Sequence, residues 1–535
     1  MKARMFLIGA AVLLAVVLAF GGTAWADQTS VQVDPSIVTE LDAGNSGTTV
    51  PVIVYATPGH LDDLTAEINP ATMDDSLALI GAVSADVSSS SLATLEALPY
   101  VDYIAADVPT FGTDYTTSLD VTNASIGLGS ITPPTAGGLD GRGIGVAVLD
   151  SGTADVADLD ASNGQSRVVG WIDFVNNRRH MYDDGGHGTF VDGLIAGNGA
   201  MSLPADQGGK ATVQYRGVAP AANIVSLKVL DSHGQGRASS LVAAIAWAIV
   251  HRSQYNIRVM NISVEGEVES PAAYDPVDRA VDAAWKAGIV VVCAAGNEGD
   301  FGKGGILSPG NDPYAITVGA ADTQQTADTS DDTVCSYSSV GPTIYDEFAK
   351  PDLVAPGNHL VSLRAPWSWV DLNYPQSRLA VSSYIAGAPS WLPATYTVMS
   401  GTSASAPVVA GAAVLMIQQN PKLTPGQVKL RLMDSADPIA GASTYAQGAG
   451  ELNVAAALAD TVSTSGYDPS AKLGTGSTVL PPDVLLQWQK YAWSKYAWSK
   501  YAWSKYAWSK YAWSKYAWSK YAWSKYAWSV VIDGQ

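Results

Sequence analysis

Four polar side chains in this sequence are of the types needed to turn a serine hydroxyl into a nucleophile. They are Asp150 in "VAVLDSGT", His187 in "GGHGTFVDG", Asn297 in "VVVCAAGNEG" and Ser403 in "SGTSASAP". A serine hydroxyl is nearly inert unless a base, an orienting acid and an oxyanion site converge on it. The chemistry would be covalent catalysis, provided that the fold brings these four distant residues together.

Each of these residues has a chemical role and an ordinary structural role. A carboxylate at Asp150 can orient an imidazole, and it can equally form a turn or cap a helix. The Asn297 amide can donate to an oxyanion or form an Asx-type turn. Ser403 begins a helix whose first N–H groups favour negative charge, and a simple N-cap explains it equally well. Taken singly, Asp150 and Ser403 favour the structural role, and His187 is undecided.

The elements that must position these residues belong to an α/β domain between Leu139 and Asp460. The segments "GIGVAVLD", "NIVSLKVL", "VMNISV", "GIVVVCAAG" and "AITVGA" are largely apolar over strand length, as buried parallel strands are. Helical segments such as "ASSLVAAIAWAIVHR" lie between them, which predicts a parallel sheet flanked by helices on both faces. Functional groups gather at the carboxyl ends of such strands, where Asp150 and Asn297 stand.

The four motifs resemble, in the same order, those of the subtilisin-like serine proteases, or subtilases. The resemblance covers most of residues 139–460 and includes "VAPAANIVSLKVLD" and "GAGELNVAAAL". It implies that Ser403 is the nucleophile, His187 the general base and later acid, and Asp150 the orienting carboxylate. It also implies an oxyanion hole made by Asn297 and the backbone N–H of Ser403. An esterase of another α/β fold is disfavoured, because no G-x-S-x-G elbow surrounds Ser403.

The segment "ISVEGE" resembles the strand with which this family binds extended peptides through backbone groups. Substrate binding is therefore assigned to Glu298, beside Asn297, and to four residues of this segment: Ser263, Val264, Glu265 and Gly266. From the carboxylates of Glu265 and Glu298 we hypothesise a preference for basic or polar residues near the cleaved bond. The alternative is that both carboxylates are solvated bystanders on the rim.

Two residues near His187 depart from the family pattern. Phe190 replaces a frequent second histidine, and Asp192 replaces a small residue. We expect Phe190 to pack in the core. Because an unpaired buried carboxylate is costly, we expect Asp192 to be partly solvated or paired.

The N-terminal part of the chain contains two segments that are predicted to be removed during maturation, a signal peptide and a propeptide. Residues 1–26 combine two basic residues, an apolar run and an "AWA" site, which is typical of a secretory signal peptide and predicts a secreted protein. Residues 50–110 alternate strand and helix patterns and resemble the family's inhibitory propeptide, a small ferredoxin-like α+β unit. Residues 111–138 form a polar linker, where the resemblance implies self-cleavage of a zymogen.

The C-terminal part contains a linker over 461–489 and eight copies of "KYAWS" over 490–529. A period of five keeps neither a strand face nor a helix face apolar, while Tyr, Trp and Lys suit stacking and cation–π contacts. This aromatic tail could bind polysaccharide or lipid headgroups at the cell envelope, self-associate, or be a slippage repeat without function. A rival to the enzyme is a non-catalytic surface-binding protein in which the tail carries the function.

The remaining composition limits partners and cofactors. A net charge of −20 argues against nucleic-acid partners, and proteins or peptides are the expected substrates. The family resemblance implies no cofactor for the chemistry. Structural calcium is common in the family, and Asp183 and Asp184 give an acidic approach to His187, but no metal ligands are assigned. Cys293 and Cys335 could form one bridge or two buried thiols.

Overall fold

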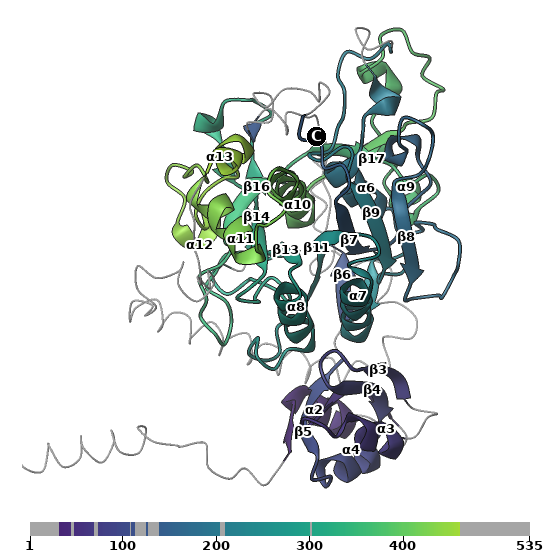
Figure 1. Cartoon of the computed structure of the whole chain (residues 1–535), viewed down its shortest axis with the longest axis vertical. Helices are drawn as coiled ribbons and strands as arrows, with labels where there is room; N and C mark the ends of the chain where they lie inside the picture. Colours follow the sequence, from purple (N-terminus) through teal and green to yellow (C-terminus); the bar gives the residue numbers. More distant parts are fainter. Residues whose placement is uncertain are drawn as a thin grey trace, which may run out of the picture.

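The computed structural model describes residues 31–43, 48–68, 73–107, 109–112, 125–126, 138–203, 209–299 and 302–460. The predicted signal peptide, the aromatic tail and most of the 111–138 linker lie outside the described residues. None of the helices in these ranges is both long enough and apolar enough to cross a bilayer. The chain folds into an N-terminal unit and a larger α/β unit (Figure 1).

An eight-stranded sheet forms the centre of the larger unit, in the order β15-β14-β13-β11-β7-β9-β8, with β16 paired to β14. Its strands are β7 (Gly145–Asp150), β8 (Val168–Asp173), β9 (Asn223–Lys228), β11 (Ile257–Ile262), β13 (Val290–Ala294), β14 (Ile316–Asp322), β15 (Thr333–Val334) and β16 (Leu353–Pro356). All neighbouring pairs are parallel except β14 and β15. The predicted parallel sheet is therefore a mixed sheet with one short antiparallel edge strand.

Helices cover both faces of this sheet, as the apolar strands predict. Val146 and Val148 of β7 point into a core shared with one set of helices: α6 (His187–Ala196), α10 (Thr402–Gln419), α11 (Pro425–Asp434) and α13 (Val454–Ala459). Ala147 and Leu149 point to the opposite face, against α7 (Ala238–His251) and α8 (Pro276–Lys286). Because successive strand residues alternate between faces, β7 is buried on both sides and fixes Asp150 at its end.

Smaller elements complete the larger unit. The strands β17 (Leu360–Leu363) and β18 (Tyr396–Met399) form an antiparallel pair beside α6. The short helices are α9 (Trp369–Asn373) and α12 (Thr444–Gln447), with 3-10 turns at Ala157–Leu159, Ala200–Ser202, Thr329–Asp331, Pro375–Ser377 and Val381–Ser383.

The N-terminal unit is a five-stranded sheet in the order β1-β5-β2-β4-β3. Its elements are β1 (Gln32–Val33), α2 (Pro35–Ala43), β2 (Val50–Ala56), α3 (Leu61–Glu67), β3 (Met73–Leu77), β4 (Ala82–Val87), α4 (Ser89–Glu96) and β5 (Val101–Ala106). One face of the sheet packs on its own helices through Val52, Val54 and Ile104. The other face, with Ile53 and Tyr55, shares a core with α7 and α8 of the larger unit (Figure 1).

The two units are joined by a third sheet. The strand β6 (Pro109–Gly112) leaves the N-terminal unit and lies between β10 (Gln235–Arg237) and β12 (Val264–Gly266), antiparallel to both. The segment after β5 therefore enters the larger unit as an extended strand.

Candidate active site

A short, buried contact joins two of the predicted residues, Asp150 and His187. Nδ1 of His187 lies 2.7 Å from Oδ1 of Asp150, and the two side chains are 4% and 1% exposed. The same carboxylate oxygen accepts the backbone N–H of Ser151 at 2.7 Å, which fixes the carboxylate toward the ring. An imidazole held through Nδ1 transfers protons to a substrate through Nε2.

Asp183 holds the start of α6, the helix that begins at His187. Its Oδ1 accepts the N–H of Gly186 at 2.7 Å and the hydroxyl of Ser151 at 2.8 Å. Its Oδ2 accepts the N–H and the hydroxyl of Thr189, at 2.9 and 2.6 Å. One carboxylate thus caps the first turn of α6 and ties it to the turn after β7.

The approach of α6 to β7 also depends on glycine. A Cβ added at Gly188 would lie 2.1 Å from the carbonyl oxygen of Gly152, and Gly152 itself has a φ of +115°. Side chains at these two positions would push the helix away from the strand end. The small residues beside His187 therefore let its ring reach Asp150.

Ser403 is the second residue of α10 and is 2% exposed. Pro407 has no N–H, so the carbonyl of Ser403 lacks the helical donor that would come from four residues later. The hydroxyl of Ser263 donates to this carbonyl instead, at 2.9 Å. The side chain of Ser263, a predicted substrate-binding residue, therefore contacts Ser403 itself.

The amide of Asn297 is oriented by the residue next to Ser403. Its Oδ1 accepts the N–H of Thr402 at 3.0 Å and the hydroxyl of Thr402 at 3.1 Å. Among the residues that the structure describes, its buried Nδ2 has no hydrogen-bond partner. The amide therefore presents a donor beside the start of α10, which is the arrangement an oxyanion hole needs.

The two groups of residues lie at the same end of the sheet. Asp150 ends β7, and Asn297 follows β13, while α6 and α10 begin at His187 and Thr402 and pack against each other. The carboxylate–imidazole pair at the start of α6 and the serine–amide pair at the start of α10 therefore lie at the carboxyl end of the same sheet, where only β11 separates β7 from β13.

A strand slot leads to this end of the sheet. Val264, Glu265 and Gly266 form β12 and pair with Gly112, Phe111 and Thr110 of β6, respectively. On its other side β6 pairs with β10. In that sheet β10 and β12 meet only through β6, so the slot between them fits one extended peptide.

Comparison with known proteins identifies the family. The profile of the subtilase family matches residues 141–459. The chain belongs to the subtilase family. It is 40% identical over 324 residues to the serine protease AprX of Bacillus subtilis (strain 168), a match covering 59% of this chain and 66% of AprX. Subtilisin DY of Bacillus licheniformis is 32% identical over 323 residues, covering 60% of this chain and 93% of that protein.

A solved structure agrees with the fold. Fervidolysin from Fervidobacterium pennivorans, described as a keratinolytic enzyme related to subtilisin, is 21% identical with a TM-score of 0.59. The match covers 81% of this chain and 64% of that one. The family match and the homologues make this subtilase a subtilisin-like serine endopeptidase.

The acidic residues before His187 have partners within the protein. Asp183 is the helix cap described above, and Asp184 pairs with the buried ammonium of Lys228 at 2.6 Å. Within the described ranges, no group of three or more His, Cys, Asp or Glu side chains is arranged to hold a metal ion. Structural calcium in this subtilase stays a prediction without assigned residues.

Several site residues of the subtilase have roles that the motifs alone did not indicate. These roles are the capping of α6 by Asp183, the orientation of the Asn297 amide by Thr402, and the donor that Ser263 supplies to the Ser403 carbonyl because of Pro407. Pro407 is the one readable signal, since a proline inside a helix always leaves one carbonyl without its donor. Glu265 and Glu298 are both partly exposed, and Cys293 and Cys335 are buried and unbridged.

Proposed function

We propose that this subtilase is a secreted endopeptidase that cleaves peptide bonds with Ser403 as nucleophile, His187 as general base and Asp150 as orienting carboxylate. The observation that carries the proposal is the buried 2.7 Å contact between His187 and Asp150. A carboxylate on Nδ1 fixes the tautomer and stabilises the imidazolium that forms when the serine proton is taken.

The other described groups fit successive steps of the reaction. His187 would take the Ser403 proton through Nε2 while the hydroxyl oxygen attacks the scissile carbonyl, and would then return it to the leaving amine. Nδ2 of Asn297 and the N–H of Ser403, at the start of α10, would stabilise the oxyanion. The peptide would lie in the slot between β10 and β12, paired through backbone groups.

A fluorophosphonate probe tests the assignment. We expect the mature wild-type protein to be labelled at Ser403, and Ser403→Ala to lose both labelling and peptide hydrolysis. His187→Ala should fold, keep Ser403 and label far more slowly, because the hydroxyl has lost its base. Labelling of Ser403→Ala at the wild-type rate, or silence of the mature wild type, would contradict the proposal.

We further propose that the N-terminal unit is a ferredoxin-like inhibitory propeptide, which contains the predicted residues 50–110 and begins earlier, with β1 and α2, and that it is removed by self-cleavage within 108–138. The position of β6 in the strand slot supports this, because a strand there excludes a substrate. Asp107 supports it too, since its Oδ1 accepts the N–H of Ser239 at 2.9 Å and caps α7.

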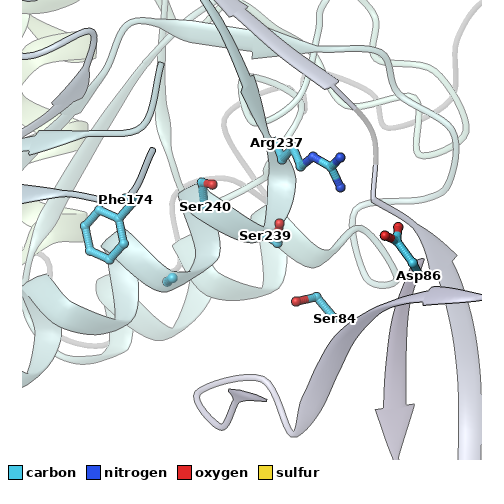
Figure 2. Close-up of a pocket in the computed structure, with 7 residues that line it drawn as sticks. Ser84, Asp86, Phe174, Arg237, Ser239 and Ser240 are labelled. Carbon is cyan, nitrogen blue, oxygen red and sulfur yellow. The ribbon is translucent and has the colours of Figure 1, made fainter. Parts of the chain in front are cut away.

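Polar contacts lie beside the apolar core that the N-terminal unit shares with α7 and α8. A polar cavity of about 270 Å³ lies between the units, with Asp86 and Arg237 facing across it (Figure 2). A central contact is made by Arg279 on α8, whose guanidinium lies 4.0 Å from the ring centre of Tyr55. The same guanidinium donates to the carbonyl of Ile80 at 3.2 Å.

N-terminal sequencing of the secreted protein tests the processing. Wild type should begin after β6, and Ser403→Ala should stay intact; efficient maturation of that variant would contradict self-cleavage. For inhibition, we expect Arg279→Ala to weaken binding of the separate N-terminal unit to mature enzyme by about tenfold. Lys286→Ala, an exposed change on the same helix, is the matched control and should leave the inhibition constant unchanged.

The preference for basic or polar residues stays a proposal. It is supported by Glu265, which lies on β12 directly opposite Phe111 of the inserted strand. A fluorogenic peptide panel on Glu265→Gln and Glu298→Gln tests it: both changes should reduce the preference for Lys and Arg. A strict wild-type preference for acidic residues would remove the idea.

Secretion and any contact of the aromatic tail with polysaccharide or lipid headgroups are proposed from sequence alone. Deleting residues 490–529 should leave hydrolysis of short peptides unchanged and reduce retention on isolated cell envelopes. Equal retention of the two forms would contradict a binding role for the tail.

A further inference from the structure

Asp192 is an acidic residue that the proposed reaction does not use. It lies on α6, five residues after His187, and is 0% exposed. The expectation of partial solvation is wrong, and the expectation of pairing is met by Thr153, whose hydroxyl lies 2.5 Å from Oδ2 of Asp192. In the described part of the chain, the other oxygen, Oδ1, has no hydrogen-bond partner.

The hydroxyl of Thr153 connects three elements around the candidate site. Thr153 follows β7 by three residues, and its Oγ1 lies 2.7 Å from Oγ of Ser226 on β9. Because a hydroxyl has one proton, it cannot donate to both Asp192 and Ser226. Two arrangements satisfy the geometry: Thr153 donates to Asp192 while Ser226 donates to Thr153, or a protonated Asp192 donates to Thr153 while Thr153 donates to Ser226.

The surroundings of Asp192 also oppose a charge there. Asp150 on β7 and Asp183 before α6 are its acidic neighbours, and His187 stands on its own helix. The ammonium of Lys228 on β9 is engaged by Asp184 and by the carbonyls of Ser151 and Leu230. Burial raises the pKa of the Asp192 carboxyl well above its usual range; the hydrogen bond from Thr153 acts against this rise, and the charges of Asp150 and Asp183 add to it.

We propose that Asp192 is a positioning residue: as a neutral acid it ties α6 to Thr153 and Ser226, and so holds His187 against Asp150. Its neutrality matters because a second buried carboxylate behind Asp150 would favour the imidazolium and weaken the base at a given pH. This inference rests on the proposed roles of Asp150, His187 and Ser403.

Three variants of the mature enzyme test the inference with a short fluorogenic peptide between pH 5.5 and 10. Asp192→Asn keeps shape, neutrality and a donor for Thr153, so kcat should stay within about twofold of wild type. Asp192→Ala and Thr153→Val break the link, so each should lower kcat by about tenfold or more with little change in KM. Fluorophosphonate titration corrects each rate for the fraction of folded sites.

The acid limb of the plot of kcat/KM against pH distinguishes a positioning role from a merely structural one, because a merely structural residue would not shift it. That limb reports the ionisation of the free base. If Asp192 is neutral in wild type, Asp192→Asn leaves the limb in place. If Asp192 is charged in wild type, Asp192→Asn removes a negative charge near His187 and shifts the midpoint of the acid limb to lower pH by roughly half a unit or more. Such a shift would overturn the proposal.

Other outcomes are equally decisive. Wild-type kcat in Thr153→Val, or an Asn variant as slow as the Ala variant, would overturn the positioning role. If Asp192→Ala does not fold, Thr153→Val and the Asn pH profile still decide. Failure of the proposed function appears separately, as a mature wild type that the probe does not label.

Discussion

Two buried clusters of ionisable groups adjoin β16: one has more basic than acidic groups, and the other has only acidic groups. In the first cluster, the Asp352 carboxylate lies between Lys350 Nζ at 2.7 Å and Lys429 Nζ at 3.0 Å. Both ammonium groups also donate to the carbonyl of Ala315, each at 2.8 Å. Two cations therefore share one anion, and backbone carbonyls accept the remaining protons.

The second cluster contains two acids and no cation. Asp332 and Glu451 are 6% and 2% exposed, and within the described ranges none of their four carboxyl oxygens has a hydrogen-bond donor from another group. The backbone of Glu451 pairs with Val354 of β16 and with Asp437, which fixes the position of its Cα. A proton shared between the two acids is the remaining way to satisfy them.

The difference between the clusters gives opposite responses to pH. Burial, with the charge of Lys350 in the same direction, lowers the pKa of Lys429 to about 7. Burial, followed by the contact with Asp332, raises the pKa of Glu451 to about 9. The contribution of Lys429 to the unfolding free energy therefore increases as pH rises from about 7 to 10.5. The contribution of Glu451 decreases as pH rises from about 4.5 to 9.

The largest effect is expected from Asp352→Asn, which removes the carboxylate that Lys350 and Lys429 share. Below about pH 7, where Lys429 is protonated, two buried ammonium groups would lose this counter-charge, which costs about 3–5 kcal/mol of unfolding free energy. Thermal unfolding in a Ser403→Ala background, free of self-digestion, measures the loss. Asp331→Asn, an exposed change of the same type on the 3-10 turn Thr329–Asp331, is the control. Equal unfolding midpoints for the two variants would contradict the conclusion that Lys350 and Lys429 share the Asp352 carboxylate.

Glu451→Gln tests the second cluster and should change stability in the opposite direction. The amide removes the need for a shared proton and can itself donate to Asp332. At pH 9 we expect the unfolding free energy of the variant to exceed that of wild type by on the order of a few kcal/mol, and its unfolding temperature to be higher. At pH 4.5 the two proteins should unfold at nearly the same temperature. A variant that is less stable than wild type at both values would show that the pair is not a source of alkaline destabilisation.

Lys429→Met should give a smaller, pH-dependent change. The wild-type contribution of Lys429 grows between pH 7 and 10.5, because the unfolded chain binds its proton more tightly than the folded one does. The variant should lack this rise, a difference on the order of 2 kcal/mol across the window. Parallel stability curves for wild type and variant would contradict the lowered pKa.

The sequence predicted those parts of the fold that local patterns encode. The five apolar segments became β7, β9, β11, β13 and β14, because a strand buried on both faces is apolar throughout. The edge strand β8 was missed because its sequence has no continuous apolar run: Gly170 interrupts it, Asp173 ends it, and four of its six residues are at least partly exposed. The antiparallel β15, only two residues long, carries no detectable pattern at all.

In the candidate site too, local motifs were predictable and contacts between distant segments were not. The contact between Asp150 and His187 was expected from motif order, and the structure has it. The roles of Asp183 and Ser263 were not expected, because each depends on hydrogen bonds to chain segments that meet only after folding. The insertion of residues 109–112 as β6 was missed for that reason too, since the slot that accepts them is built by residues more than a hundred positions later.

The double variant Glu451→Gln/Lys429→Met carries the smallest expected effect and tests whether the two clusters act independently. Within the part of the chain that the structure describes, the two clusters share no hydrogen-bond partner, although both adjoin β16. The two changes in unfolding free energy should therefore add within about 0.5 kcal/mol. Measured at pH 9, where both groups matter, additivity means that each cluster titrates alone. A larger deviation would mean that β16 shifts as a unit when either cluster changes charge, so that the two clusters titrate as one coupled system.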